Sequence, residues 1–301
     1  MNFTIDAVYV VYKPDLKVLK NSLLSIKDQI REIYIIDNSE DVLVKRGVAE
    51  VVEAFENVSL VQLGKNFGIA RAQNIGIERV LGRSGDFTLL SDQDTIYPED
   101  YIKKMIASYN SIPDKAKVVA IAPNFKETNR GGQAEGFFLL DGVASVRSKS
   151  MSLLEDVSQV ISSGMLIVNC LVLEVGLMDE DLFIDWVDFE WCWRARSRGY
   201  RIIGCNNIYI NHTLGDSVAS VFGKVYSLHS PERNYYIVRN GISIALKKKY
   251  LSNGVRFGIF LKSMRYMIGF IILGGKYKEN MAYCYRGFYH GLIGRLGSFG
   301  K

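Results

Sequence analysis

The stretch Phe87-Thr88-Leu89-Leu90-Ser91-Asp92-Gln93-Asp94 decides the fold. Its apolar first half predicts a buried strand, which ends where two carboxylates begin. Because alternate residues of a strand point the same way, Asp92 and Asp94 are expected on one side of the strand end. Adjacent carboxylates repel each other, so a hard divalent cation, Mg2+ or Mn2+, is their simplest partner. The alternative is a solvated Asx turn before a helix that begins near Pro98.

Apolar strands alternate with helical patterns on both sides of this stretch. Strands are predicted at 7–12, 33–36, 58–63, 87–92 and 117–123, and helices at 16–30, 42–55, 64–80 and 98–109. This alternation predicts an α/β fold with a doubly wound, mostly parallel sheet and right-handed crossovers. Ligands of such sheets bind beyond the carboxyl ends of the strands. Asp37, Gly64-Lys65-Asn66 and Asp92-Asp94 all follow strands, so we expect them to converge on one cleft.

The segment from Asn66 to Gly76 is rich in small residues and begins a predicted helix. Gly68 allows close backbone approach, and the free N–H groups of a helix start suit an anion. Arg71 is placed to add a bidentate contact to phosphate. The alternative is a slim helix packed tightly on the sheet. The G-x-G-x-x-G dinucleotide fingerprint is absent after the first strand.

Acidic and aromatic residues alternate from Met178 to Arg194. A helix is expected from about Asp188, and an acid beside tryptophans in a partly dry cleft gains the proton affinity of a general base. The alternative is an amphipathic helix whose first turn carries acids that suit its dipole. His212 follows short predicted strands at 202–204 and 208–210, and it is either a metal ligand or a structural histidine.

The remaining part of the body is less regular. Residues 124–151 are interpreted as a hairpin or a loop. Residues 159–168 are predicted to form a strand with a polar break at Ser162-Ser163-Gly164, and 171–175 a short helix.

The 301-residue chain allows one large domain or two smaller ones. It has no run of about 18 apolar residues and no basic n-region, so neither a spanning helix nor a signal peptide is expected. Four scattered cysteines indicate reduced thiols in a cytosolic protein. Residues 232–301 contain 13 Lys/Arg and 2 Asp/Glu, whereas the first 231 residues contain 24 and 30. A basic tail on an acidic body indicates a polyanionic partner, either nucleic acid or an anionic membrane.

The tail is predicted to form helices at 235–250, 255–273 and 277–288. Their apolar and aromatic residues, interrupted by Lys and Arg, are typical of helices that lie in a membrane interface. The alternative is that the helices pack on the body or form an oligomer interface. No recognised nucleic-acid-binding module is visible.

Several motifs occur in a familiar order. They are Asp37-Asn38-Ser39, Asn66-x-Gly68-x-Ala70-x-Ala72-x-Asn74-x-Gly76, Asp92-Gln93-Asp94, Ser163-Gly164, the run from Phe183 to Arg194, and His212. Over roughly residues 5–215 the chain resembles family 2 glycosyltransferases of the GT-A fold, which is Rossmann-like. The Asp-Gln-Asp form and the run Ile184-Asp185-Trp186-Val187-Asp188-Phe189-Glu190-Trp191-Cys192 resemble bacterial rhamnosyltransferases in particular.

The resemblance implies a catalytic domain at 1–217 and a role for each motif residue, whereas the basic helical region at 218–301 is predicted from its composition. Asp188 would be the base, although Val187 stands where the family has a glutamate, so Asp185 or Glu190 could take part. Asp37 would contact the base of the nucleotide donor. Asp92 would lie near the ribose or the metal, and Asp94 would bind the metal. His212 could complete the coordination shell of the metal. The other expected nucleotide-sugar contacts are Tyr12, Asn66, Gly68, Arg71, Asn74 and Gln93, and the expected acceptor contacts are Ser163, Gly164, Trp186 and Trp191.

The implied reaction is an inverting, metal-dependent transfer of L-rhamnose from dTDP-L-rhamnose to a saccharide, lipid-linked or not, in bacterial surface polysaccharide synthesis. The donor alternatives are UDP-galactofuranose and a UDP-hexose, and the alternative of another class is nucleic-acid binding by the tail. A catalytically inactive scaffold is disfavoured because nearly all expected polar positions are filled. The resemblance places the enzyme in the cytoplasm, peripheral on the inner face of the cell membrane, and leaves a homo-oligomer open.

Overall fold

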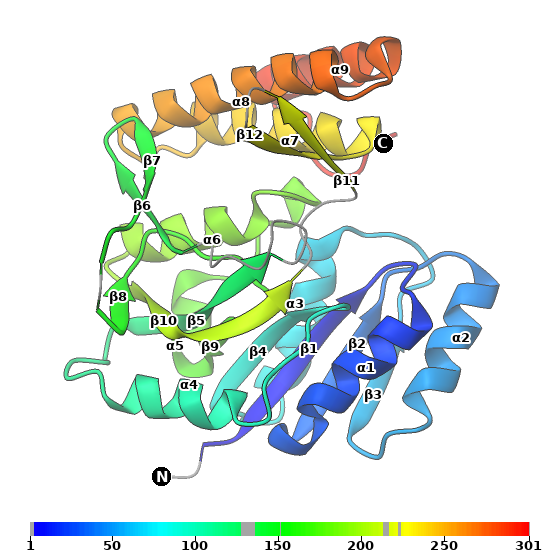
Figure 1. Cartoon of the computed structure of the whole chain (residues 1–301), viewed down its shortest axis with the longest axis vertical. Helices are drawn as coiled ribbons and strands as arrows, with labels where there is room; N and C mark the ends of the chain where they lie inside the picture. Colours follow the sequence, from blue (N-terminus) through cyan, green and yellow to red (C-terminus); the bar gives the residue numbers. More distant parts are fainter. Residues whose placement is uncertain (1–2, 128–135, 151, 213–216, 222–223, 301) are drawn as a thin grey trace.

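The computed structural model describes residues 3–127, 136–150, 152–212, 217–221 and 224–300. Of residues 127, 212, 217–221 and 224–228 only the backbone is described. Figure 1 shows a sheet covered by helices, with a second layer of helices from the C-terminal part of the chain stacked on one side.

The central sheet has eight strands within the described residues, in the order β3-β2-β1-β4-β9-β5-β10-β8. Their bounds are β1 Ile5–Val11, β2 Glu32–Asp37, β3 Val58–Gln62, β4 Phe87–Asp92, β5 Val118–Glu127, β8 Leu154–Asp156, β9 Leu166–Val168 and β10 Arg201–His212. Strands β1 to β4 pair in parallel, as do β5 and β10, whereas β9 and β8 are antiparallel to their neighbours. The mostly parallel sheet confirms the predicted fold class.

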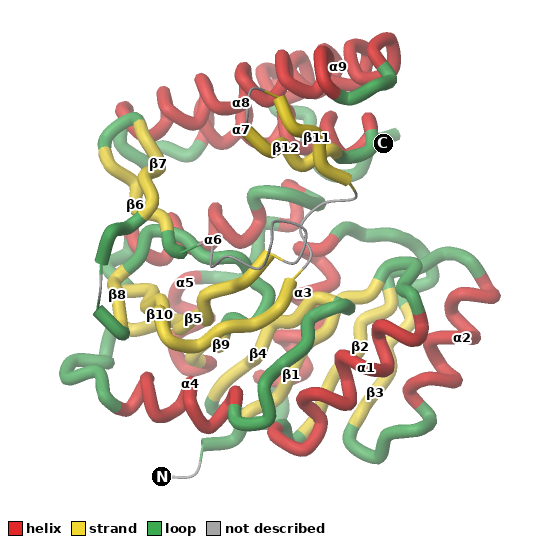
Figure 2. Tube along the Cα trace, viewed as in Figure 1, coloured by secondary structure: helices red, strands yellow, loops and turns green. Residues whose placement is uncertain are grey.

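Helices cover both faces of this sheet (Figure 2). On one face lie α1 Leu16–Ile26, α2 Val42–Val52 and α4 Tyr101–Asn110, and on the other α3 Ile69–Leu81, α5 Asn169–Val175 and α6 Val187–Ser197. The period-two pattern of the strands causes this arrangement, because Ala7 and Tyr9 pack toward α1 whereas Val8 packs toward α3. Asp15 and Asp41 cap α1 and α2 by accepting backbone N–H bonds, so these helices begin where the sequence predicts.

The C-terminal region contains the hairpin β11 Ser217–Val221 and β12 Lys224–Leu228, followed by α7 Pro231–Lys247, α8 Asn253–Leu273 and α9 Tyr277–Ile293. Helix α7 is buried along most of its length and packs against α8 and α9. A second hairpin, β6 Phe138–Asp141 and β7 Ala144–Arg147, reaches α8, where a Cβ on Gly258 would lie 1.9 Å from the carbonyl oxygen of Val143. No helix among the described residues is both long and apolar enough to cross a bilayer.

Several boundaries differ from the prediction. The predicted strand 159–168 is a strand only over β9, because Gly164 turns with φ +80° and donates its N–H to the carbonyl of Leu90. The two strands predicted near 202–210 form one strand, β10, with a register shift between Cys205 and Tyr209. Helix α3 begins at Ile69 rather than Gly64, after the extended segment that ends at Gly68.

Candidate functional site

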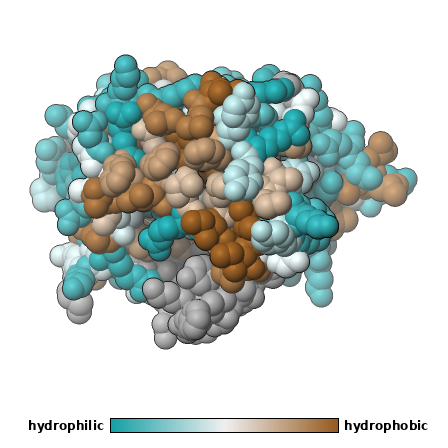
Figure 3. All heavy atoms as spheres, turned by 90° about the horizontal axis from the view of Figure 1, so that it is seen from above, coloured by the Kyte–Doolittle hydropathy of each residue, from teal (hydrophilic) through white to brown (hydrophobic). Residues whose placement is uncertain are grey.

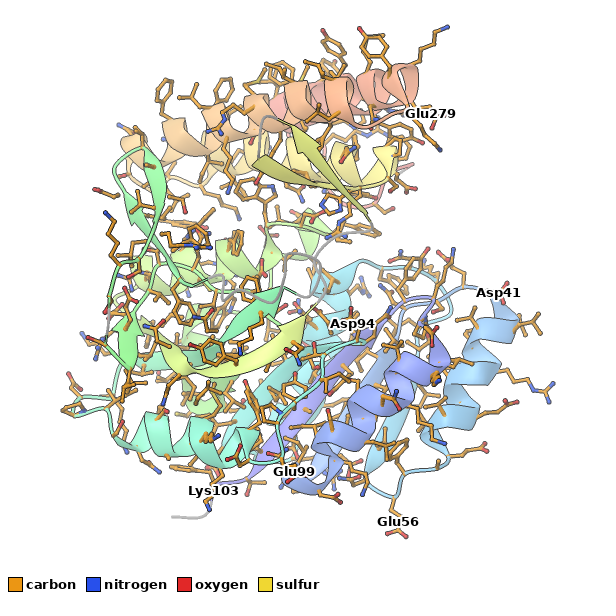
Figure 4. All side chains as sticks on the ribbon, viewed as in Figure 1. Asp41, Glu56, Asp94, Glu99, Lys103 and Glu279 are labelled. Atoms are coloured by element: carbon orange, nitrogen blue, oxygen red, sulfur yellow. The ribbon has the colours of Figure 1, made fainter. Side chains whose placement is uncertain are left out.

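The carboxyl ends of the parallel strands bring the predicted acids to one edge of the sheet. Val11 of β1 pairs in register with Asp37, and Val10 with Asp92. Asp94 follows two residues after the end of β4, and Figure 4 shows it at this edge, on the side toward the C-terminal helices. The structure therefore brings Asp37 and the Asp92-Asp94 pair to the ends of β2 and β4, the two strands that flank β1, as the sequence indicates.

Asp37 is fully buried, and only one of its carboxylate oxygens is satisfied by the described residues. Its Oδ1 accepts the backbone N–H of Ser39 at 3.0 Å, whereas Oδ2 has no hydrogen-bond partner in that part of the chain. A buried carboxylate oxygen without a donor is costly, so this atom is suited to a donor group from a ligand.

The loops after β2 and β3 are joined by a network of amides. The side chain of Asn38 donates to Oδ1 of Asn66 at 2.9 Å and accepts the N–H of Phe67 at 2.8 Å. Asn66 Oδ1 also accepts the N–H of Gly68 at 2.9 Å. These bonds hold the glycine-rich loop beside Asp37.

The loops after β1 and β4 are joined in the same way. Gln93 accepts the backbone N–H of Tyr12 at 2.8 Å, and Ser39 accepts that of Lys13 at 2.9 Å. The ring of Tyr12 is 39% exposed and lies 5.0 Å from Nζ of Lys13. Tyr12 therefore presents an aromatic surface near Asp37, and Gln93 supports the backbone that carries it.

The expectation of free N–H groups at the start of α3 is wrong. The N–H of Ile69 donates to the carbonyl of Phe183 at 2.7 Å, and a Cβ on Gly68 would lie 2.5 Å from the same oxygen. Because Gly68 has no side chain, the backbone at Phe183 can pack directly against the start of α3. This contact joins segments far apart in the sequence, so no local pattern reveals it.

Two further residues of α3 lie at its contact with the segment 178–180. The guanidinium of Arg71 stacks on Phe67 at 4.7 Å and lies 3.8 Å from Glu180, with its side chain half exposed. Asn74 is buried and bonds to the backbone of Met178 through both ends of its amide. Asn74 therefore contacts protein groups rather than the cleft, whereas Arg71 keeps an exposed edge.

Asp188 lies in the first turn of α6 and is the most unusual acid of the site. Its Oδ1 accepts the N–H of Phe189 at 2.9 Å, and its Oδ2 accepts that of Ser162 at 3.2 Å. The pKa of this carboxyl is raised from 3.8 to about 7, chiefly by burial; the two N–H bonds oppose the rise, and the negative charges of Asp92 and Asp185 add to it. The group is therefore poised to exchange a proton near neutral pH.

The turn before α6 is held in a rare conformation. Phe183, Asp185 and Trp186 have φ values of 66°, 62° and 66°, in the left-handed region that side chains other than glycine seldom adopt. Asp185 forms an ion pair with Arg233, whose Nη2 lies 3.1 Å from its carboxylate. Asp185 is therefore engaged by α7 and adds negative charge near Asp188.

Glu190 lies two residues after Asp188, also in the first turn of α6. It is fully buried, pairs with Arg194 at 3.0 Å, accepts the Tyr250 hydroxyl at 2.7 Å and lies 3.4 Å from Nζ of Lys248. These partners surround the carboxylate with positive charge, so the structure indicates a structural role rather than proton transfer.

The residues expected to contact the acceptor are mostly enclosed. The indole N–H groups of Trp186 and Trp191 donate to the carbonyls of Ile237 and Gly176, and both rings are buried. The hydroxyl of Ser163 pairs with that of Thr95 at 2.6 Å, also in the interior. The expected acceptor contact by the two tryptophans is not supported, because their polar atoms and faces pack inside the fold.

A pocket is lined in part by Phe189, the residue that follows Asp188. It is lined mainly by aromatic and aliphatic side chains, which come from Pro123, Phe125, Phe137, Phe138, Val160, Ile161 and Phe189. Phe189 follows Asp188 and Ile161 precedes Ser162, so the pocket is lined by sequence neighbours of Asp188 and of its hydrogen-bond partner, although not by Asp188 itself.

The donor set at Asp92 and Asp94 suits a hard cation. Mg2+ in phosphate-handling sites takes one or two carboxylates and completes its shell with water and phosphate oxygens. No group of three or more His, Cys, Asp or Glu side chains gathers as a metal site among the described residues. The side chain of His212 lies outside the described residues, so its expected place in a metal shell stays a prediction.

The sequence does not reveal three contributors to the site, which are the N–H of Ser162, the carbonyl of Phe183 and the ion pair of Arg233. Backbone groups carry no side-chain signature, and Arg233 lies 48 positions from its partner. Only an unusual acid-aromatic run marks the segment in the sequence.

Comparisons with known proteins agree with this geometry. The family model described as "Glycosyl transferase family 2" matches residues 7–173. The dTDP-rhamnosyl transferase RfbF of Shigella flexneri is 32% identical over 262 residues, which are 83% of this chain and 82% of RfbF.

Solved structures share the fold at low identity. TarS 1–349 of S. aureus in complex with UDP-GlcNAc has a TM-score of 0.59 at 16% identity. The match covers 96% of this chain and 81% of the TarS chain. GalNAc-T7 with UDP, GalNAc and Mn2+ also has a TM-score of 0.59, at 15% identity, and the match covers 89% of this chain but 57% of GalNAc-T7.

Proposed function

Because this chain belongs to glycosyl transferase family 2, we propose that it transfers L-rhamnose from dTDP-L-rhamnose to a saccharide acceptor by a single, inverting displacement. The observation that carries the mechanism is Asp188, whose carboxyl has its pKa raised to about 7 at the edge of the sheet where Asp92 ends β4. The identity of 32% with RfbF supports the choice of donor.

The nucleotide would lie over the ends of β1 and β2. Oδ2 of Asp37, which has no donor within the described residues, is suited to an N–H of the pyrimidine base. Tyr12 offers an exposed ring on which the base can stack, and the loop Asn66–Gly68 together with Gln93 shapes the floor. The side chain of Arg71 is half exposed, and its guanidinium is suited to bind a phosphate of the donor.

Asp92 and Asp94 would hold Mg2+ or Mn2+, with Asp92 also close to the ribose. The bound cation would offset the charge that develops on the departing diphosphate. Both carboxylates are half-buried at the end of β4, which supports this assignment.

Asp188 would accept the proton of the attacking acceptor hydroxyl. A hydroxyl is a weak nucleophile, and a carboxylate with a pKa near the working pH is an efficient base for it. The neighbouring apolar pocket supports an acceptor that presents a sugar face or another apolar group beside Phe189. Ser162 and Gly164 would form the polar wall between this pocket and the donor.

The donor is tested by measuring turnover and binding with dTDP-L-rhamnose, UDP-galactofuranose and UDP-glucose, each with Mg2+, with Mn2+ and with a chelator. Selective, metal-dependent turnover of dTDP-L-rhamnose, with binding weakened in Asp37→Ala and Asp94→Ala, is the expected result. Selection of a UDP-sugar would overturn the rhamnosyl assignment and leave the family intact. Equal turnover with the chelator would overturn the metal assignment.

We further propose that the outer faces of α8 and α9 contact an anionic membrane, where a lipid-linked acceptor would be presented. Exposed apolar residues recur at helical spacing on both helices: Phe257, Leu261, Ile268 and Ile272 on α8, and Tyr277, Tyr285, Tyr289 and Leu292 on α9. Figure 3 shows apolar residues gathered over the middle of this face and hydrophilic residues around them.

The charges of this face suit anionic lipid. Arg265, Lys276, Lys278 and Arg286 are exposed, and Glu279 is the single acid from residue 253 to the end. Each basic residue near an anionic surface contributes about 1 kcal/mol. The peripheral position on the inner face of a bacterial membrane is the location this surface supports.

Co-sedimentation with vesicles tests this partner. We expect binding to phosphatidylglycerol vesicles, little binding to phosphatidylcholine vesicles, and a roughly tenfold or greater loss in the double variant Arg265→Glu/Lys278→Glu. The control Lys20→Glu/Lys103→Glu reverses two charges elsewhere; Figure 4 shows Lys103 at the end of the molecule opposite α9. Equal binding to both vesicle types, a dimer formed through α8 and α9, or salt-sensitive binding of nucleic acid in place of lipid would overturn it.

A further inference from the structure

The turn Asp181–Trp186 connects the two halves of the site. Its Phe183 carbonyl accepts the N–H of Ile69 at the start of α3, next to the donor loop. Its other end leads directly into α6, where Asp188 occupies the first turn. Three residues of this turn have positive φ, a conformation that persists only when surrounding contacts impose it.

The contacts that impose it come from α7. Asn240 is fully buried, and its amide nitrogen lies 2.8 Å from the carbonyl oxygen of Leu182, 2.7 Å from that of Ile184 and 3.1 Å from that of Asp185. Its Oδ1 accepts Nε–H of Arg239 at 2.9 Å. The two N–H groups of one side chain are therefore shared among three carbonyls of the turn.

Arg239 donates hydrogen bonds to the same turn. It is fully buried, and Nη2 donates to the carbonyls of Asp181 at 3.2 Å and Leu182 at 2.9 Å. Its guanidinium also lies 4.8 Å from the ring of Tyr236, which stacks on Phe183. Helix α7 thus contacts the turn from Asp181 to Asp185 through a set of buried donors.

We infer that Asn240 is a positioning residue, which holds the turn so that Asp188 meets the acceptor hydroxyl while Phe183 keeps the donor loop in place. The inference rests on the proposed role of Asp188 as the base. It makes α7, which lies beyond the match of the family model to residues 7–173, part of the machinery for the reaction.

The chain offers a matched control on the same helix. Asn234 is also buried, but its amide donates to Asn280 of α9 at 2.8 Å and to the carbonyl of His229, not to the turn. Asn→Leu at either position removes buried hydrogen bonds from α7 at nearly constant volume. A purely structural role predicts that the two variants behave alike.

The experiment compares Asn240→Leu and Asn234→Leu with the wild type. We expect both to lower Tm, whereas Asn240→Leu alone lowers kcat at least 100-fold, leaves the Kd of the donor within threefold, and speeds amide exchange in residues 183–189. Asn240→Ser, a smaller change, is measured beside it and should lower kcat at least 20-fold.

Two results would overturn the inference: kcat within threefold of wild type in a folded Asn240 variant, or an equal loss of kcat in Asn234→Leu. Asp188→Asn is measured in parallel. If Asp188→Asn keeps its turnover, the proposed base is wrong, whereas the amide exchange of 183–189 still shows whether Asn240 holds the turn.

Discussion

The backbone N–H of Ser162 donates a hydrogen bond of 3.2 Å to Oδ2 of Asp188, a residue 26 positions away. This bond ties the first turn of α6 to the loop whose Gly164 bonds to the carbonyl of Leu90 in β4. The carboxylate is therefore fixed relative to the strand that carries Asp92. Because the donor is a backbone group, the bond survives any side chain at position 162 that keeps the loop conformation.

Replacing Asp188 by asparagine should abolish proton transfer while keeping the shape of the site. We expect kcat to fall by about 10² to 10⁴, the usual contribution of a general base. Donor affinity, measured by calorimetry, should stay within threefold. A loss of kcat below tenfold would mean that another group removes the proton.

The pH dependence of the wild-type enzyme should report the pKa of Asp188, which is raised to about 7. The base acts in its deprotonated form, so kcat/KM should rise about tenfold per pH unit below 7 and level off above it. Measurement from pH 5 to 9 with excess acceptor checks this. A flat profile across pH 5.5–7 would contradict the assignment.

Replacing Asp185 by asparagine should move that profile toward lower pH. The negative charge of Asp185 helps to raise the pKa of Asp188, so its removal stabilises the ionised base. Arg233, which pairs with Asp185, would be left with its positive charge and would act in the same direction. If Asp185 were the base itself, the variant would lose turnover at every pH instead.

Replacing Glu190 by alanine should lower the free energy of unfolding of the protein. It should not remove a catalytic group. Breaking a buried ion pair from one side costs about 3–5 kcal/mol, and here Arg194 and Lys248 would both lose their partner. Chemical denaturation measures the change in the free energy of unfolding. The exposed pair Arg46–Glu50 is the control, since Glu50→Ala should cost about 0.3–0.5 kcal/mol. A cost equal to that of the control would contradict the structural role of Glu190.

Replacing Gly68 by alanine should be far more damaging than the same change at Gly64. Gly68 has φ +86° and ψ 160°, and its new Cβ would lie 2.5 Å from the Phe183 carbonyl oxygen. The backbone conformation alone costs about 1–3 kcal/mol, and the steric clash adds to it. Gly64 has φ +76° with open space around it, so its variant should show the backbone cost alone. Equal Tm values for the two variants would contradict the close contact with Phe183.

The order of strands and helices could be predicted from the sequence, because hydrophobic periodicity is a local property that follows the face each residue buries. The strand ending at Asp92 and the acids after it were predicted for the same reason. Of the hairpin and the loop that the sequence leaves open within 124–151, the structure contains the hairpin β6–β7, and the predicted break at Ser162-Ser163-Gly164 is a turn.

Tertiary structure alone decided which of several similar residues stand at the site. Asp188 and Glu190 are two residues apart in one acidic run. Asp188 has its pKa raised by burial and by the charges of Asp92 and Asp185, whereas Glu190 lies among Arg194, Lys248 and Tyr250. Trp186 and Trp191 look alike as aromatic contacts until their indole N–H groups are seen bonded inside the fold. The physical reason is that burial, charge and hydrogen-bond partners of these side chains come from segments tens of positions away, which no local pattern contains.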